Sequence, residues 1–192
     1  MNTIDSVYTL DDRVFLALNG DLGNTADSIF WFASGIYQWI PLYLLILFFI
    51  YRKFGWKTML WSLVFIVVAT VVADQICNIA KYGLKKLRPS HDPDLAGMVH
   101  IVKGYKGGLY GTFSAHAATC FTIAAFTSRL FQNTYYTIFI YLWCVFVAYS
   151  RIYLGVHFPL DLFLGGITGY LSGWMAYRIF DRKIKGRIRV CL

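Results

Sequence analysis

The sequence predicts an all-α protein that crosses a membrane several times. Of its 192 residues, 58% are hydrophobic and 19% aromatic, and the mean hydropathy is +0.54. An ordinary soluble domain of this size carries less apolar composition. The apolar residues also fall into runs of about 20, the length that a helix needs to span a bilayer. We therefore predict one integral-membrane domain over residues 1–192, a multi-pass helical bundle.

Five spans and one further helix are expected. The spans are 29–51, 56–82, 112–131, 134–153 and 159–180. Most of them end near cationic or aromatic residues, which anchor helix ends at the membrane surface. Residues 11–19 are too short to span and mix charged with apolar side chains, which predicts an N-terminal helix lying in the interface. In the last span, four glycines should permit close helix packing. They are Gly165, Gly166, Gly169 and Gly173.

The distribution of cations predicts the topology. Ten of the 18 Lys and Arg residues, including those of the 52–57 loop and the 182–189 tail, lie on one side of the predicted bundle. The positive-inside rule places that side in the cytoplasm. The long 83–111 loop and the connection before the fifth span then face outward. We expect a protein of the cell (inner) membrane whose functional groups lie on the outer, periplasmic side.

Composition also excludes other classes of protein. A net charge of +8 is typical of nucleic-acid-binding proteins, but here the cations lie at the ends of apolar runs and form no basic stripe. Nucleic acid is therefore not an expected partner. Cys77, Cys120 and Cys144 lie inside apolar segments and Cys191 in the tail, with no metal-ligand spacing. We expect neither a disulfide nor a zinc site.

The segment Ser150–Asp161 carries a cation, an imidazole and a carboxylate between two apolar runs. His157 and Asp161 are four residues apart, so the carboxylate can accept the Nδ1–H and leave Nε2 free. A histidine nucleophile or base is oriented in this way. Arg151, beyond a bend at Gly155, offers donors that match phosphate oxygens. The structural alternative is a capped helix start with an interfacial arginine.

A second cluster closes the second span. Lys81 and Arg88 are seven residues apart, two helical turns, so both can reach one anion before Pro89 ends the helix. The alternative is a basic helix end that contacts lipid headgroups.

The third cluster, Phe113-Ser114-Ala115-His116, opens the third span. A helix N-terminus presents free N–H groups to an anion. Ser114 can add a hydroxyl donor and His116 a proton. The alternative is a capping serine beside an interfacial histidine.

All three clusters fall on the outer side, and together they resemble the motifs of the type 2 phosphatidic acid phosphatases, relatives of the vanadium haloperoxidases. The first motif of that family, Lys, six residues, Arg-Pro, fits Lys81–Pro89. The third, Ser-Arg, five residues, His, three residues, Asp, fits Ser150–Asp161. The second is Pro-Ser-Gly-His, from which Phe113 and Ala115 depart while Ser114 and His116 match.

The resemblance implies a two-step reaction. His157, oriented by Asp161, attacks phosphorus and forms a phosphohistidine, and His116 protonates the leaving group and then activates water. Fixed cations and backbone N–H groups hold the phosphate oxygens, so no metal or other cofactor is expected. The residues with this implied role are Lys81, Arg88, Ser114, Ala115 and Arg151.

The implied substrate is a membrane lipid with a terminal phosphate or diphosphate. We rank lipid A phosphate and undecaprenyl diphosphate first, and phosphatidate and phosphatidylglycerol phosphate next. One alternative is a phosphotransferase on the same scaffold. Another is a non-catalytic lipid-binding or transport protein, although a transporter would more often show repeated halves.

Other polar residues carry weaker expectations. Asp74 lies about 10 Å deeper than Lys81 at the helical rise, where it either supports a catalytic cation or makes a structural contact. His91 and His100 are expected to be solvated in the long loop. Tyr105 and Lys106 are candidates for contacts with a lipid headgroup.

Overall fold

The computed structural model describes the backbone of residues 3–185 and the side chains of residues 8–184. This part of the chain forms six α-helices, so the predicted all-α class is confirmed. They are α1 (Thr3–Leu18), α2 (Asn24–Ser34), α3 (Ile40–Leu84), α4 (Ala115–Phe131), α5 (Thr134–Tyr153) and α6 (Pro159–Phe180). Short 3₁₀ turns occur at Tyr37–Trp39, Pro89–His91, Pro93–Leu95 and Val102–Gly104, and Asp181–Lys185 forms a π turn.

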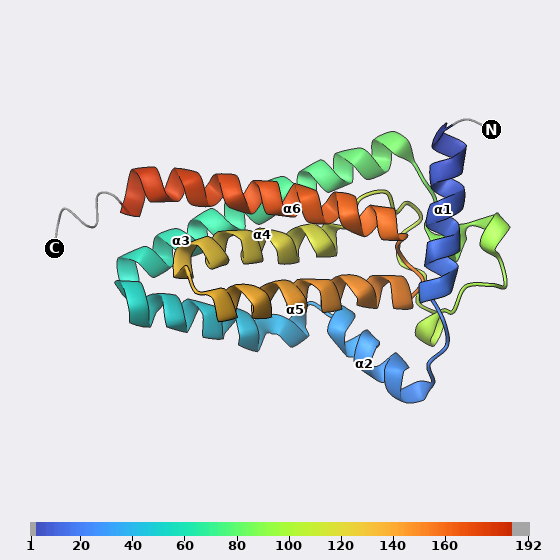
Figure 1. Ribbon diagram of the computed structural model, residues 1–192, viewed down its shortest axis with the longest axis horizontal. Helices are drawn as coiled ribbons and strands as arrows, with labels where there is room; N and C mark the ends of the chain where they lie inside the picture. The colour runs from blue at the N-terminus through green and yellow to red at the C-terminus, as the bar shows by residue number, and fades with distance from the viewer. Residues whose placement is uncertain (1–2, 186–192) are drawn as a thin grey trace.

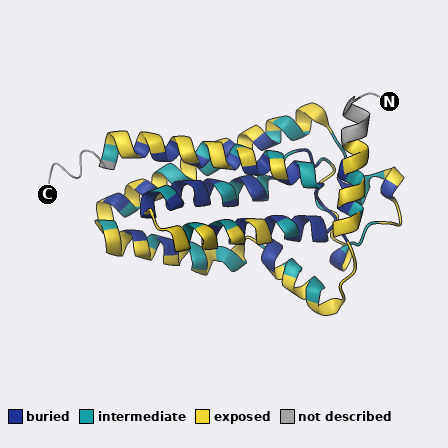
Figure 2. Cartoon of the chain, in the orientation of Figure 1, coloured by how far each residue is buried: buried dark blue, intermediate teal, exposed yellow. Residues whose placement is uncertain are grey.

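Helices α3 to α6 run lengthwise in one bundle, and α1 crosses its far end (Figure 1). Helix α4 is the central helix, since it is coloured mostly as buried while its neighbours expose one face (Figure 2). Phe126 and Leu130 of α4 pack in one core with Ile140 of α5 and Phe180 of α6. The three described cysteines, Cys77, Cys120 and Cys144, are buried free thiols.

Glycines bring α6 against α4. A Cβ atom at Gly169 would overlap the carbonyl oxygen of Ala118, and one at Gly173 would overlap that of Thr122. The Thr122 hydroxyl also donates to the Gly169 carbonyl at 3.1 Å. The close packing expected from the glycines of the last span is therefore confirmed.

The first predicted span, 29–51, is wrong as a single helix. Helix α2 ends at Ser34, Gly35 is extended, and α3 begins only at Ile40, with Pro41 in its first turn. Proline suits that position because its missing N–H would be unpaired there anyway. The apolar run of the sequence continues through Gly35, so hydropathy alone does not reveal this break.

Helix α3 turns back on itself at Gly55. The φ of Gly55 is 81°, in the left-handed region that glycine adopts without strain. The chain therefore reverses direction at this residue, and the two halves of α3 diverge from the turn toward the other end of the bundle (Figure 1). This reversal falls between the predicted first and second spans.

Two of the described helical stretches are long and apolar enough to cross a membrane. They are Tyr37–Leu84, which includes the reversal, with a hydropathy of 2.1, and Thr134–Tyr153, with 1.3. Apolar side chains point outward along α3, where Leu44 is 61% exposed and Ile79 73% exposed. Apolar faces of this extent on a helical bundle favour a lipid surround.

The predicted helical connection from Lys81 to Arg88 is wrong. Helix α3 ends at Leu84, and Lys85 adopts a left-handed φ of 51° that stops it. Leu87 then pairs with Tyr110 in an isolated bridge, in which the Arg88 N–H donates to the Leu109 carbonyl at 3.1 Å. Arg88 is thus positioned by contact with the far end of the loop and not by helical periodicity.

Helix α1 is longer than the predicted 11–19 segment and packs on the loops at the end of the bundle. Its Asp11 is 7% exposed and accepts hydrogen bonds from Lys86 Nζ at 3.1 Å and from the Leu160 N–H at 2.9 Å. Phe15 meets the Phe158 ring edge-on, with centroids 5.3 Å apart. The N-terminal helix therefore fixes the connection that carries His157.

Candidate active site

The three predicted motifs meet at one end of the bundle, where α3 ends, α4 begins and α5 connects to α6 (Figure 1). His116 lies within electrostatic range of Arg151, His157, Arg88 and Lys81. Segments that are far apart in the sequence thus contribute to one polar pocket.

His157 is held between a carboxylate and a guanidinium. Gly155, at a φ of 72°, turns the chain after α5 so that the His157 side chain points inward and is 2% exposed. Its Nδ1 lies 3.2 Å from Asp161 Oδ2, and its Nε2 lies 3.4 Å from Arg88 Nη1. Asp161 Oδ2 also accepts the Phe158 N–H at 3.1 Å, which fixes the carboxylate at the start of α6. An Nδ1–H bonded to Asp161 leaves Nε2 available to attack phosphorus.

Backbone carbonyls hold the Arg88 guanidinium in place. Its Nε donates to the Tyr110 carbonyl at 3.0 Å and its Nη1 to the Val156 carbonyl at 3.1 Å. A Cβ atom at Gly111 would lie only 3.0 Å from Arg88 Cγ, so the loop approaches closely because this residue is glycine. The cation is thereby fixed beside His157 before any phosphate binds.

Arg151 and Lys81 supply two further cations. Arg151 is 3% exposed and donates to the hydroxyl of Ser34 and, at 3.5 Å, to that of Tyr105. Lys81 Nζ lies 3.4 Å from Asn78 Oδ1, and Asn78 Nδ2 lies 2.9 Å from Asp74 Oδ2. This chain of hydrogen bonds connects Asp74 through Asn78 to Lys81, which is compatible with both of the roles expected for Asp74.

The start of α4 is tied to the start of α6. Ser114 is fully buried, its N–H donates to the Asp161 carbonyl at 3.0 Å, and its hydroxyl oxygen accepts the Ala117 N–H at 3.4 Å as the helix N-cap. Ala115 and His116 occupy the first two helical positions, whose N–H groups have no partner within the helix. These donors, the Ser114 hydroxyl proton and the helix dipole suit an anion.

Burial lowers the pKa of His157 well below its usual value, and the cations Arg88 and Arg151 lower it further. Burial likewise lowers the pKa of Arg88, which remains a cation. His157 is therefore neutral at neutral pH, the state in which imidazole is a nucleophile. Because the pKa is lowered, His157 should also remain neutral as the pH falls through about 6.5, where a free histidine is half protonated.

Two polar residues near the pocket were missed by the sequence interpretation. Asn19, which directly follows α1, is 4% exposed, and its Nδ2 donates to the carbonyls of Ile152 at 2.8 Å and Tyr153 at 2.9 Å. Ser34 contacts Arg151 from the end of α2. The positions of both depend on long-range contacts that no local spacing reveals.

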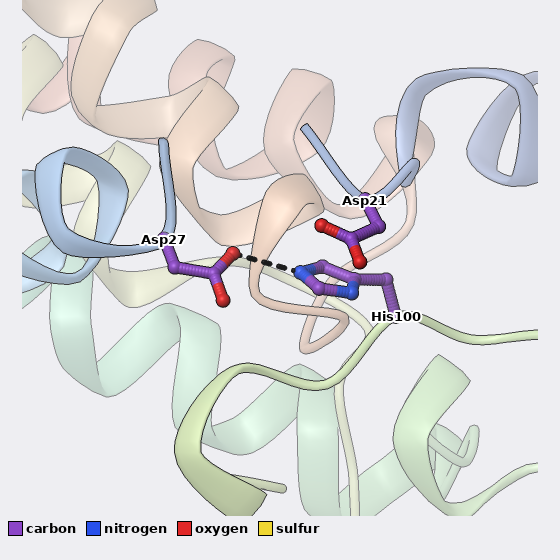
Figure 3. A group of neighbouring side chains, drawn as sticks. All are labelled: Asp21, Asp27 and His100. Carbon is purple, nitrogen blue, oxygen red and sulfur yellow. Dashed lines mark hydrogen bonds and ion pairs between the residues drawn. The ribbon is translucent and has the colours of Figure 1, made fainter. Parts of the chain in front are cut away.

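The expectation that His100 is solvated is wrong. His100 Nε2 lies 2.9 Å from Asp27 Oδ1, which also accepts the Tyr153 hydroxyl at 2.7 Å (Figure 3). Asp21 lies close by as well. One carboxylate oxygen of Asp21, one of Asp27 and one ring nitrogen of His100 all lie within 4.8 Å of one another. These contacts fasten α2 to the end of α5 and to the long loop. His91 is also partly buried, with Nε2 3.5 Å from the Gly107 carbonyl.

A buried histidine beside fixed cations, at the end of an apolar helical bundle, suits an enzyme that acts on a phosphate group at a membrane. The sequence model of the PAP2 superfamily matches residues 59–185, which include all three motifs. The chain belongs to the PAP2 superfamily, and the resemblance noted from its motifs is confirmed.

Similar proteins agree with this assignment. The lipid A 4'-phosphatase of Bacteroides thetaiotaomicron is 36% identical over 97% of this chain and 83% of its own length. The lipid A 4'-phosphatase of Porphyromonas gingivalis is 33% identical over 92% of this chain and 75% of its own length. The crystal structure of Aquifex aeolicus LpxE superposes with a TM-score of 0.63 at 25% identity, covering 88% of this chain and 95% of that one.

Proposed function

We propose that this lipid phosphatase removes a phosphate from the saccharide headgroup of lipid A. The observation that carries the proposal is the 36% identity to a lipid A 4'-phosphatase over 97% of the chain. The second relative bears the same name. Undecaprenyl diphosphate, ranked equally from the motifs, becomes the second candidate.

The first step is an in-line attack of His157 Nε2 on phosphorus. The bond between phosphorus and the sugar oxygen breaks, and His116 donates its proton to that oxygen. Asp161 stabilises the positive charge that develops on the His157 ring through the 3.2 Å contact with Nδ1.

The second step is hydrolysis of the phosphohistidine. His116, now neutral, accepts a proton from water as the water attacks phosphorus, and free phosphate leaves. Throughout, Lys81, Arg88 and Arg151 neutralise the equatorial oxygens together with Ser114 and the Ala115 N–H, where charge spreads in the transition state.

The proposed membrane placement has five spans. They are the two halves of α3 on either side of Gly55, followed by α4, α5 and α6. Arg52, Lys53 and Lys57 lie at the turn of α3, at the end of the bundle opposite the pocket (Figure 1). The positive-inside rule supports a cytoplasmic location for that end, so the pocket opens on the periplasmic side of the inner membrane.

The test is phosphate release by purified protein in detergent from four lipids: lipid A, undecaprenyl diphosphate, phosphatidate and phosphatidylglycerol phosphate. We expect release from lipid A to be fastest, without any added acceptor. Faster release from undecaprenyl diphosphate would change the assigned substrate. Release that requires an acceptor lipid would indicate a phosphotransferase, and binding without turnover a transport or binding protein.

Activity is expected to persist in excess EDTA, because three fixed cations neutralise the phosphate oxygens. Vanadate, which adopts the trigonal-bipyramidal geometry of the transition state, should inhibit. The measurement is the initial rate before and after chelation. Loss of activity on chelation that a divalent ion restores would contradict this prediction.

Cysteine labelling tests the sidedness in a variant without its four native cysteines. A membrane-impermeant thiol reagent applied to spheroplasts should label Gly108→Cys and leave Lys57→Cys unlabelled until the membrane is opened. Gly108 suits the purpose because a Cβ atom there meets nothing within 4 Å, whereas one at Gly107 would lie 3.0 Å from Arg88 Nη1. The reverse pattern would place the pocket in the cytoplasm.

A further inference from the structure

A cleft of about 330 Å³ opens beside the phosphate-binding side chains, and its walls are aromatic. Trp31, Tyr37 and Tyr105 line it, together with His116 and Arg151. This volume lies within the range of ligand pockets, about 300–1,000 Å³. Because His116 protonates the leaving group in the proposed reaction, part of the substrate beyond the phosphate must lie next to His116.

The helix break at Gly35 builds one wall of this aromatic cleft. Gln38, in the 3₁₀ turn after the break, folds back over Gly35 so closely that a Cβ atom there would overlap its amide group. Gln38 Oε1 is buried and has no hydrogen-bond partner among the described residues. Buried polar groups are rarely left unpaired, and Gln38 also lines the cleft, so its side-chain amide is a group that a polar ligand in the cleft would pair with.

Neighbouring side chains fix the aromatic rings. Trp31 and Tyr105 meet at right angles with centroids 5.7 Å apart, and Lys103 Nζ lies 4.9 Å from the Trp31 ring. Arg151 lies 5.8 Å from the Tyr105 ring as well as close to its hydroxyl. Fixed rings with polar groups between them suit a ligand that has apolar C–H faces and several hydroxyls.

A second cavity, of about 220 Å³, also reaches His116 and shares Gly35 with the aromatic cleft. Trp39, Tyr43 and Val147 line this inner slot. A third, apolar cavity of about 270 Å³ shares Tyr43 with it and continues between α3 and α4. Together these cavities lead from His116 along α3 to an apolar groove whose Val67 and Val71 are about half exposed. That groove suits a hydrocarbon tail, which leaves the aromatic cleft for a polar group.

We propose that the aromatic cleft is a saccharide subsite, which holds the sugar ring that carries the scissile phosphate. The inference rests on the proposed function and assigns specificity to Trp31 and Gln38. The Trp31 ring contacts the sugar, and the Gln38 side-chain amide hydrogen-bonds one of its hydroxyl or amide groups. A lipid phosphate without a sugar cannot make these contacts.

The test measures binding in the His157→Ala background, where turnover is removed. The probes are lipid A monophosphate and phosphatidate, which share a phosphate and acyl chains and differ in the sugar. Trp31→Leu should lower the ratio of the two affinities, sugar lipid over phosphatidate, by about three- to tenfold. Gln38→Met should lower the same ratio by about threefold.

Trp61→Leu is the matched control, since Trp61 lies on α3 outside the lining of the cleft and is 46% exposed. Its ratio should equal that of the parent protein. An unchanged ratio in both test variants, or an equal loss for both lipids, would overturn the subsite and reduce these aromatic residues to interfacial anchors. The two proposals can fail separately. If the wild-type protein released no phosphate from lipid A, the proposed hydrolysis would be refuted. The ratio of the two binding affinities, which needs no turnover, would still decide the subsite.

Discussion

His157→Ala is expected to abolish phosphate release, whereas Asp161→Asn should leave a residual rate. Without His157 no group remains to form the phosphohistidine, so the loss should exceed the factor of about 10²–10⁴ that general acid–base catalysis contributes. Asparagine at position 161 still occupies the site of the contacts with His157 Nδ1 and the Phe158 N–H. It removes only the charge that stabilises the imidazolium.

The measurement is kcat for lipid A with purified variants, and His91→Ala is the matched control. His91 lies in the long 83–111 loop, and its ring contacts the Gly107 carbonyl. It should retain a rate close to that of the wild type. Near wild-type turnover by His157→Ala would exclude a phosphohistidine at this position.

Gly169→Val should lower both the unfolding temperature and the activity. A side chain at this position would overlap the Ala118 carbonyl and force α6 away from α4. Overpacking of this kind costs about 1–3 kcal/mol, and here backbone atoms must move. The same movement would strain the hydrogen bond from the Ser114 N–H to the Asp161 carbonyl, so we expect at least about a tenfold loss of kcat/KM, about 1.4 kcal/mol.

Gly166→Ala is the control for this variant. Gly166 is buried in the same helix, but a Cβ atom there would meet the Phe121 ring at 3.5 Å, an ordinary contact. Its unfolding temperature should match or exceed that of the wild type, because alanine favours the helix by about 1 kcal/mol over glycine. Equal behaviour of the two variants in thermal unfolding would refute the close α4–α6 contact.

Local spacing explains what could be predicted from the sequence. The spans 134–153 and 159–180 coincide with α5 and α6, since Asn133 caps one helix and Pro159 opens the other. The one-turn separation of His157 and Asp161 likewise encodes their contact. For these elements the determinants lie within a few residues of each other.

The features that escaped prediction depend on distant parts of the chain. Helix α3 stops at Leu84, earlier than the predicted end at Pro89, because Lys85 turns the chain and the loop then pairs with Tyr110. His100 meets Asp27 across 73 positions of sequence. The break at Gly35 lies inside an apolar run, where hydropathy is the same for one helix and for two.

The contacts of α1 have a consequence for biosynthesis. Asp11 accepts a hydrogen bond from the Leu160 N–H, and Asn19 donates to the carbonyls at the end of α5. The support for the His157 connection therefore comes from the part of the chain that is synthesised first, whereas the connection itself is synthesised near the end. The pocket cannot close until α6 has been made and has packed on the rest of the bundle. A nascent chain therefore carries no finished catalytic centre during its insertion, and an N-terminal truncation that removes α1 would leave the connection bearing His157 without its support.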